Sequence, residues 1–392
     1  MRTFGTQATG IRTPIVYEGD NLPQIVVDSL IEYTQTNKVK IDERDIIGVT
    51  EAVVARTQGN YATTDQIAAD VREKFPSGTV GVVFPILSRN RFSILLKGIA
   101  AGADKLVIQL SYPTDEVGNH IITLEEIYQA DVNPYTDVFT EEEFRARFKN
   151  LKHEFTAIDY IELYRNLGNN AQIIMANDPS EILKYTKNVI AADIHTREQT
   201  KRRLLACGAQ TVYTLDEILN TSVNGSGYND TYGLLGSNKA GEDRVKLFPR
   251  ACDAFVTKVQ ELIREATGVK VEVLVYGDGA FKDPVGKIWE LADPVVSPAF
   301  TSGLDGLPNE LKLKYLADNE LADKRGEAAR EAMVERIRTK DQDLKGKEET
   351  EGTTPRRLTD LIGSLCDLTS GSGDKGTPVI YIKGYFDNYA SE

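Results

Sequence analysis

The chain has 392 residues, and its 46 Lys and Arg against 59 Asp and Glu give a formal charge of −13. With 41% hydrophobic and 27% charged residues it has the composition of a globular protein, and its length predicts two or three domains. The chain has no apolar run long enough for a membrane span and no signal-peptide core, so we expect a cytoplasmic protein with no membrane partner. Its acidic charge balance disfavours nucleic acid as a partner.

The first 60 residues predict two short strands and a helix. IRTPIVYEGD (11–20) is typical of a strand followed by a turn. NLPQIVVDSLIEYTQ (21–35) places its apolar residues on one helical face. DERDIIGVTEAVVART (42–57) begins with a turn and predicts a strand at 46–49, followed by a second apolar stretch.

Residues 79–219 predict a parallel sheet that is covered on both faces. Five short apolar runs occur in this region: TVGVVFPI, KLVIQLSY, AQIIMAND, NVIAADI and AQTVYTL. Helical segments such as RFSILLKGIAAG, PSEILKYT and TREQTKRRLLACG lie between several of these runs, as in a doubly wound α/β unit. The polar, helix-rich residues 112–168 interrupt the pattern and would form either a lid or a decoration at the sheet edge.

The rest of the chain alternates irregular and regular segments. Residues 221–243 lack periodicity and are rich in Gly, Asn and Ser, and a loop of this length is more often functional than idle. A helix (251–268) and a strong strand (269–278) follow, and the charged residues 309–352 predict solvated helices. The C-terminal part predicts a helix, a Gly/Ser loop and a strand.

Chemistry is expected in the irregular segments beside these strands. Glycine lets backbone N–H groups approach an anion closely, and acidic residues at strand ends can hold Mg²⁺ against phosphate. Asp278 ends the strand at 269–278, where it is either a metal ligand or a turn residue. Gly371–Gly376 matches GxGxxG, but it follows a helix and opens a strand, which is the wrong context for a dinucleotide fingerprint.

Arg89 and Arg91 place two guanidinium groups beside a predicted helix N-terminus. Such a pair suits a carboxylate or a phosphate, and the alternative is a set of surface salt bridges. Three widely spaced cysteines and only three histidines argue against a disulfide framework and against a histidine-rich metal centre. His195 is more simply explained as packing at the start of the next helix.

Several segments, taken in order, resemble one family. They are Pro14–Asp20, Asp45–Gly59, Gly233-Leu-Leu-Gly-Ser-Asn238 with Val245-Lys-Leu-Phe-Pro249, Val273-Leu-Val-Tyr-Gly-Asp278, and the C-terminal helix, loop and strand from Pro355 to Gly384. Together they resemble the coenzyme F420-0:L-glutamate ligases, which are γ-glutamyl ligases. The resemblance covers less than half of the chain.

This resemblance implies an α/β fold with an α+β ligase-like body, 1–60 plus 221–392, and an inserted parallel-sheet unit over 61–220. It implies an acid–amino-acid ligase that uses GTP and Mg²⁺ or Mn²⁺ to join L-glutamate to a small-molecule acceptor through an acyl phosphate, and a homodimer. It also implies site residues. Asp278 would bind the metal and Arg56 would neutralise phosphate charge, while the nucleotide would contact Pro14, Arg56, Asn238, Ser370, Gly371, Ser372 and Gly373.

The sequence departs from the family pattern at the metal site. Leu235 stands where the family has a second metal-binding Asp, Gly279 replaces a Thr, and Ser372 stands where a Gln is expected. We expect Asp230 to supply the missing charge, with Asp283 and Asp374 as alternatives. Charge and position, rather than the resemblance, assign Arg89 and Arg91 to the carboxylate of an acidic substrate.

Two other interpretations stay open. The chain could be a non-catalytic nucleotide- or metabolite-binding protein on the same scaffold, and Leu235 favours this interpretation. It could also be a different α/β enzyme whose site lies within 79–219. The lack of a glycine fingerprint after TVGVVFPI argues against that possibility.

Overall fold

The computed structural model describes residues 5–76, 78–153, 156–168, 171–278, 295–350, 356–370 and 374–391. The chain divides into two compact units. The first unit contains Met1–Val54, Ala251–Asp278 and the described residues from 295 onward, and the second contains Ala55–Arg250. In neither unit do the described residues form a helix that is both long and apolar enough to cross a membrane.

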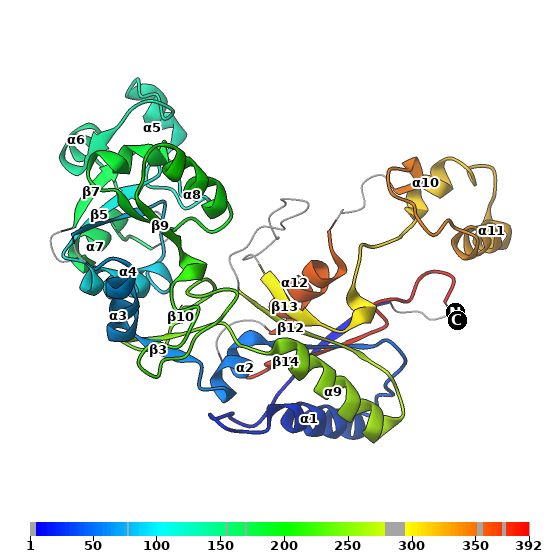
Figure 1. Ribbon diagram of the computed structural model, residues 1–392. Helices are drawn as coiled ribbons and strands as arrows, with labels where there is room; N and C mark the ends of the chain where they lie inside the picture. Colours follow the sequence, from blue (N-terminus) through cyan, green and yellow to red (C-terminus); the bar gives the residue numbers. More distant parts are fainter. Residues whose placement is uncertain are drawn as a thin grey trace. The chain divides into compact units, whose positions relative to one another are not determined.

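A five-stranded sheet forms the centre of the first unit (Figure 1). Its strands, in spatial order, are β1 (Gln7–Ile11), β14 (Val379–Lys383), β2 (Ile46–Thr50), β12 (Glu272–Asp278) and β13 (Val295–Phe300). β2 and β12 are parallel, and every other pair is antiparallel. The two parallel strands therefore end at the same edge of the sheet.

Helices cover both faces of this sheet, as Figure 1 shows. α1 (Leu22–Asn37) and α9 (Cys252–Thr267) pack together on one face, where they bury Val26, Leu30 and Val259 against Ile47. α12 (Leu358–Ser370) covers the other face and packs on Ile46. Because successive strand residues point to opposite faces, the Ile46–Ile47 pair in β2 contributes to both cores.

The remaining elements of the first unit are short or charged. Two helices, α10 (Leu313–Asp318) and α11 (Gly326–Arg338), share a small apolar cluster of their own with Leu311, Leu321 and Leu344, and the 3₁₀ turns are η3 (Ser302–Leu304) and η4 (Glu348–Thr350). The predicted strand in 11–20 was wrong beyond its first residue, because β1 ends at Ile11. Pro14 has no N–H group with which to continue a strand ladder.

The second unit contains the predicted parallel sheet. In spatial order its strands are β6 (Phe139–Thr140), β7 (Gln172–Met175), β5 (Lys105–Leu110), β4 (Thr79–Val83), β8 (Asn188–Ala191) and β9 (Thr211–Thr214). All five apolar runs form strands, and all five of these strands run parallel, whereas the edge strand β6 is antiparallel. The strand order reverses direction at β4, which makes the β4–β8 pair the topological switch point of the sheet.

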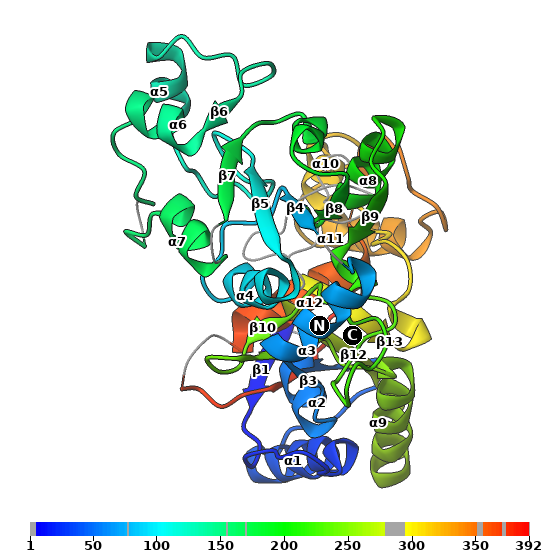
Figure 2. The ribbon, with the colours of Figure 1, turned by 60° about the vertical axis from the view of Figure 1, so that its left-hand side comes forward.

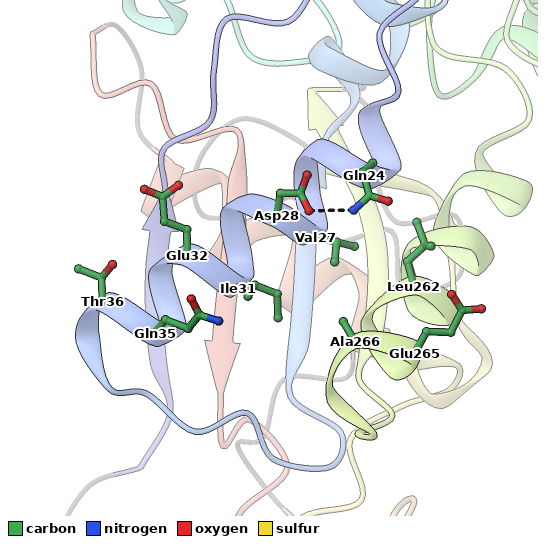
Figure 3. A pocket seen from close by; sticks show the side chains of 10 residues that line it. All are labelled: Gln24, Val27, Asp28, Ile31, Glu32, Gln35, Thr36, Leu262, Glu265 and Ala266. Atoms are coloured by element: carbon green, nitrogen blue, oxygen red, sulfur yellow. Dashed lines mark hydrogen bonds between the residues drawn. The ribbon is translucent and has the colours of Figure 1, made fainter.

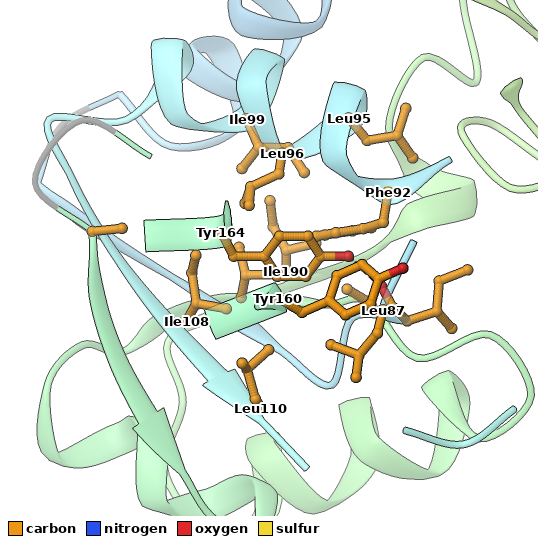
Figure 4. Close-up of a cluster of buried hydrophobic side chains, with 14 of the residues drawn as sticks. Leu87, Phe92, Leu95, Leu96, Ile99, Ile108, Leu110, Tyr160, Tyr164 and Ile190 are labelled. Atoms are coloured by element: carbon orange, nitrogen blue, oxygen red, sulfur yellow. Dashed lines mark hydrogen bonds between the residues drawn. The ribbon is translucent and has the colours of Figure 1, made fainter. Parts of the chain in front are cut away.

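Helices pack on both faces of this sheet as well (Figure 2). One face carries α4 (Phe92–Gly102) and α7 (Tyr160–Leu167), whose aromatic and aliphatic side chains pack on β5 and β8 (Figure 4). α3 (Thr64–Lys74) packs on α4 and belongs to the same apolar cluster. The other face carries α8 (Arg197–Ala206) and the 3₁₀ helix η1 (Pro179–Lys184). The predicted helix PSEILKYT is the short 3₁₀ helix η1 rather than an α-helix. The doubly wound α/β arrangement is confirmed.

Residues 112–168 decorate the sheet edge rather than covering it as a lid, since β6 pairs with β7. Two short helices, α5 (Leu124–Gln129) and α6 (Glu141–Arg147), belong to this segment, and both begin with a threonine capping box.

A separate three-stranded antiparallel sheet joins β3 (Tyr61–Thr63), β11 (Arg244–Lys246) and β10 (Asn238–Lys239).

This small sheet shows why residues outside 61–220 belong to the second unit. β3 follows α2 (Glu51–Thr57), whereas β10 and β11 come almost 180 residues later, after the 3₁₀ turn η2 (Leu215–Glu217). The predicted insertion lies wholly inside the second unit, which also holds 55–60 and 221–250. That 61–220 is an insertion into a ligase body stays a prediction.

Gly48 offers a test of how α12 packs on the sheet. A Cβ at this position in β2 would overlap with Sγ of Cys366. We expect Gly48→Ala to lower the free energy of unfolding by about 1–3 kcal/mol, the usual cost of overpacking a core. Urea denaturation of the full chain measures it.

Cys366→Ala in the Gly48→Ala background should restore part of this loss, because the Sγ atom is removed while Cβ of residue 366 stays within 3.3 Å. Gly5→Ala is the control, since a Cβ there meets nothing within 4 Å. Equal stabilities of Gly48→Ala and Gly5→Ala would contradict the packing described.

Candidate functional site

Two buried asparagines hold the long irregular segment 221–250 in the second unit. Oδ1 of Asn60 accepts hydrogen bonds from Tyr228 N (3.0 Å) and from Nη1 of Arg250 (2.8 Å), and its Nδ2 donates to Phe248 O (2.5 Å). Nδ2 of Asn229 donates to Phe248 O and Pro249 O. The segment lacks a long strand or helix, so these side chains replace the missing backbone ladder.

The glycines of the Gly233–Asn238 motif have defined structural roles. Gly233 has a φ of +49°, and a Cβ there would be 2.5 Å from the carbonyl oxygens of Asp216 and Ile218. Gly236 has a φ of +70° and lies against the ring of Phe248. Only glycine combines this backbone conformation with such close approach. The motif therefore brings Asn238, which begins β10, to a fixed place on the small sheet.

Leu235 lies in an apolar environment. Its side chain is 2% exposed, and it lines a small cavity together with Ile86, Leu95, Ala192 and Ile194. An unpaired carboxylate at this position would be costly to bury. The packing therefore suits Leu rather than Asp at position 235.

The structure brings the two predicted arginines next to Asn238. The arginine loop, residues 86–91, follows β4 and carries Arg89 and Arg91. Asn90 O in this loop accepts a hydrogen bond from Lys239 N (2.9 Å), the residue after Asn238. Two predictions made separately from the sequence therefore meet in one place within the second unit.

Buried polar groups hold the arginine loop in position. The Tyr164 hydroxyl, on α7, donates to Ile86 O (2.5 Å) and accepts from Ser88 N (2.9 Å), and burial raises the pKa of this hydroxyl. Oδ2 of Asp115 accepts a hydrogen bond from Leu87 N (2.8 Å). The backbone that carries Arg89 and Arg91 is therefore fixed at three successive residues, although Arg89 itself is exposed.

Arg56 lies near the end of α2, in the part of this helix that belongs to the second unit, and its side chain is exposed. The residues that follow are tied to 248–250. Gln58 exchanges two hydrogen bonds with the backbone of Arg250, at 2.6 and 2.8 Å. Asp230 is also an exposed residue of this unit and follows the buried Asn229.

In the first unit, the end of β12 is the expected metal position. Asp278 is the last residue of β12, and its side chain lies outside the described part. The register pairs Tyr276 with Thr50, so β2 ends beside β12. Glu51, which follows Thr50, is 3% exposed, and its side chain packs against Gly277. Sequence reasoning missed Glu51, because only the parallel pairing of β2 with β12 places it against Gly277.

The other predicted residues of the first unit are placed as follows. Pro14 is exposed and follows β1. Ser370 ends α12, where its hydroxyl donates to Asp367 O (2.9 Å) and its carbonyl accepts from the Thr377 hydroxyl (3.1 Å). Asp374 is exposed. Gly279, Asp283, Gly371, Ser372 and Gly373 lie outside the described residues.

No three His, Cys, Asp or Glu side chains within the described parts of the chain are grouped so that they could hold a metal ion. Of the carboxylates that the structure does describe, Glu51 packs against Gly277, the residue before Asp278 in the chain. Carboxylate oxygens are the ligands that Mg²⁺ prefers, so Asp278 and Glu51 are each of the right chemical type for a magnesium ion.

One cavity of the first unit does not suit anionic substrates. A groove of about 620 Å³ lies between α1 and α9 and is lined by Asp28, Glu32 and Glu265 together with apolar side chains (Figure 3). Gln24 Nε2 donates to Asp28 Oδ1 (2.8 Å) within it. Three carboxylates at its rim would repel a nucleotide or glutamate.

A second cavity lies in the second unit, where the parallel strands end. It measures about 460 Å³ and lies between residues that follow β4 and β7 and the first turns of α8. Beside it is Asp193, which follows β8 and is 1% exposed. Oδ2 of Asp193 accepts hydrogen bonds from the Thr196 hydroxyl (2.7 Å) and the Thr200 hydroxyl (2.8 Å). Burial, with a smaller contribution from the nearby Glu116 carboxylate, raises the pKa of Asp193 to about 6.

A family model described as F420-0:Gamma-glutamyl ligase matches residues 10–384 of the chain, and so includes residues of both units. A search of curated proteins found no significant match.

Tyr164→Phe tests the support of the arginine loop. Loss of the hydroxyl leaves Ile86 O and Ser88 N without this partner, and we expect the free energy of unfolding to fall by about 1–3 kcal/mol. Tyr160→Phe, in the same helix, is the matched control. Within the described residues, the Tyr160 hydroxyl has no hydrogen bond comparable to those of Tyr164. Urea denaturation that gives equal losses for the two variants would contradict this role.

The raised pKa of Asp193 makes the free energy of unfolding depend on pH. A pKa raised to about 6 in the folded chain means that the folded state holds a proton that the unfolded state has already released near pH 5. The contribution of Asp193 to stability therefore falls as pH rises from about 4 to above 6, by on the order of 3 kcal/mol at 1.36 kcal/mol per pKa unit.

Asp193→Asn should consequently gain stability relative to the natural chain as pH rises from 4.5 to 7.5, as measured by urea midpoints. Asp305→Asn, an exposed position, should show no such trend. A constant difference between Asp193→Asn and the natural chain across this range would show that Asp193 does not titrate as described.

Proposed function

Because the chain belongs to the F420-0:gamma-glutamyl ligase family, we propose that it is a GTP-dependent ligase that joins L-glutamate to a small-molecule carboxylate. The match to the family over residues 10–384 is the observation that carries this proposal, since it includes both units rather than one shared motif. We further propose that the enzyme acts in the cytoplasm as a homodimer.

The chemistry requires activation of the acceptor. A carboxylate and an amine do not condense in water at neutral pH, because the leaving oxygen is too basic. In the proposed mechanism, an acceptor carboxylate oxygen attacks the γ-phosphorus of GTP, and GDP leaves. The amino group of glutamate then attacks the acyl carbon of the acyl phosphate, loses a proton, and displaces inorganic phosphate to form the amide. Positioning and charge neutralisation are the main requirements of such steps.

The second unit supplies the proposed cationic and amide contacts. Arg56 neutralises phosphate charge and Asn238 contacts the nucleotide. Arg89 and Arg91 bind the carboxylate of an acidic substrate, and the fixed backbone of the arginine loop supports this role, since it limits the entropy lost on binding. The contact between Asn90 and Lys239 supports a shared site for Asn238 and the two arginines.

The first unit supplies the proposed metal and loop contacts. Asp278 holds Mg²⁺ or Mn²⁺, which would neutralise phosphate charge when bound. Asp230 is the carboxylate that we propose to supply the missing charge, and we add Glu51, which packs against Gly277, as a second candidate. Pro14 and the loop of Ser370, Gly371, Ser372 and Gly373 contact the nucleotide, the loop through its backbone N–H groups.

A second candidate function is nucleotide or metabolite binding without turnover. The buried, apolar surroundings of Leu235 favour it, because they remove a metal-binding position of the family. Thermal stabilisation by GTP and Mg²⁺ without release of phosphate, in the presence of L-glutamate and acceptors, would establish this function instead.

Asp278→Asn tests the ligase proposal. Phosphate release from GTP, measured with L-glutamate, Mg²⁺ and a panel of carboxylate acceptors, should fall by about 100-fold or more, because one charged metal ligand is lost. The exposed Asp305→Asn should keep full activity, and circular dichroism should show both variants folded. Undiminished phosphate release by Asp278→Asn would remove this residue from the mechanism.

A further inference from the structure

The ligase proposal does not use the cavity beside α8. Its volume of about 460 Å³ is in the range of pockets for small metabolites. It lies where β4 and β7 end and adjoins α8, which follows β8. In open sheets with parallel strands, ligands bind outside the carboxyl ends of the strands at the point where strand order reverses, and β4–β8 is this point here.

The backbone is unusual at the wall of this cavity. Phe84, which follows β4 and lines the cavity, has a φ of +55°. A bulky residue rarely adopts this left-handed conformation, and such strain is concentrated at functional sites. The Phe84 N–H donates to Gln109 O (2.9 Å), which holds the residue in place.

One face of α8 supplies the polar lining. Thr196, Gln199, Thr200 and Arg203 all line the cavity, and their spacing of three, four and seven residues puts them on the same side of the helix. Leu204, by contrast, points into the apolar core beneath the sheet. The sequence therefore gives α8 one polar face toward the cavity and one apolar position toward the strands.

Asp193 determines what the two threonine hydroxyls can recognise. Each hydroxyl donates its single hydrogen to Oδ2 of Asp193. Each threonine oxygen is left with lone pairs and no proton, so it can only accept a hydrogen bond from a ligand. The buried negative charge directly behind these oxygens favours a ligand donor that is positively charged, such as a primary ammonium group.

Arg203 provides the opposite chemistry one turn along the helix. Its side chain is 54% exposed, and its Nη2 bonds Oδ2 of Asp178 at 3.2 Å. A guanidinium group has five N–H donors in a planar fork, so donors remain for a carboxylate. Thr200 and Arg203 are three residues apart, or about 4.5 Å along the helix axis. This separation suits an ammonium and a carboxylate on one small molecule.

We propose that this cavity binds a free α-amino acid, with its ammonium group on the Thr196 and Thr200 oxygens and its carboxylate on Arg203. Phe84 and Tyr135 provide the apolar wall for the side chain of the amino acid. The site is separate from the proposed ligase residues, none of which lines the cavity. It therefore gives the second unit a ligand of its own.

The test is isothermal titration of the full chain, without nucleotide, using L-alanine, L-glutamate, L-leucine and L-phenylalanine as probes. Propionate, which is L-alanine without its amino group, and propylamine, a three-carbon amine without a carboxylate, serve as the half-molecules. We expect saturable binding of at least one amino acid, and at least tenfold weaker binding of both half-molecules, because each makes only one of the two charged contacts.

Variants locate the binding. Arg203→Met should weaken it at least tenfold, whereas Arg202→Met, an exposed neighbour outside the cavity, should leave it unchanged. Thr200→Val should weaken binding, and Thr200→Ser, which keeps the hydroxyl, should restore it. Circular dichroism checks that each variant is folded.

No binding of any of the four amino acids, or binding that Arg203→Met and Thr200→Val both leave unchanged, would overturn the proposal. Propylamine that binds as tightly as the best amino acid would also overturn it in favour of a simple cation site. Phosphate release from GTP by Asp278→Asn and by the natural chain is measured separately, so failure of the ligase proposal and failure of this one are distinguished.

Discussion

Parallel strand pairing is the constraint on which both units depend. Neighbouring parallel strands end at the same edge of a sheet, so the residues after them meet there regardless of their distance in the sequence. In the first unit, the pairing of β2 with β12 brings Glu51 beside Gly277. In the second, β4 between β5 and β8 brings the arginine loop and Asp193 to one edge.

The sequence predicted strands correctly where apolar residues form a continuous run. Five apolar runs became five parallel strands, because both faces of that sheet are covered and most strand positions are apolar. The sequence could not predict Glu51 as a site residue, since its neighbours in the chain give no sign of Gly277. Nor could it predict that Asp193 would orient two threonine hydroxyls, because only the start of α8 brings all three together.

The residues of the Gly233–Asn238 motif have different physical roles. Gly233 and Gly236 are required by their backbone and by close contacts, so part of the family-like motif is structural. Leu235 within the same motif is buried in apolar surroundings. The motif therefore fixes the path of the chain toward Asn238, and its residue 235 is an apolar packing position. The ligase proposal consequently depends on carboxylates near β12.

The most direct measurement of the central claim follows oxygen during the reaction. The chain is incubated with GTP, Mg²⁺, L-glutamate and each acceptor of the carboxylate panel, F420-0 included, with ¹⁸O in the acceptor carboxylate, and phosphate and product are analysed by mass spectrometry. We expect a glutamyl adduct and an equal amount of phosphate that contains one ¹⁸O atom, because the acceptor oxygen leaves with the phosphoryl group. Unlabelled phosphate without an adduct, or no phosphate at all, would contradict it.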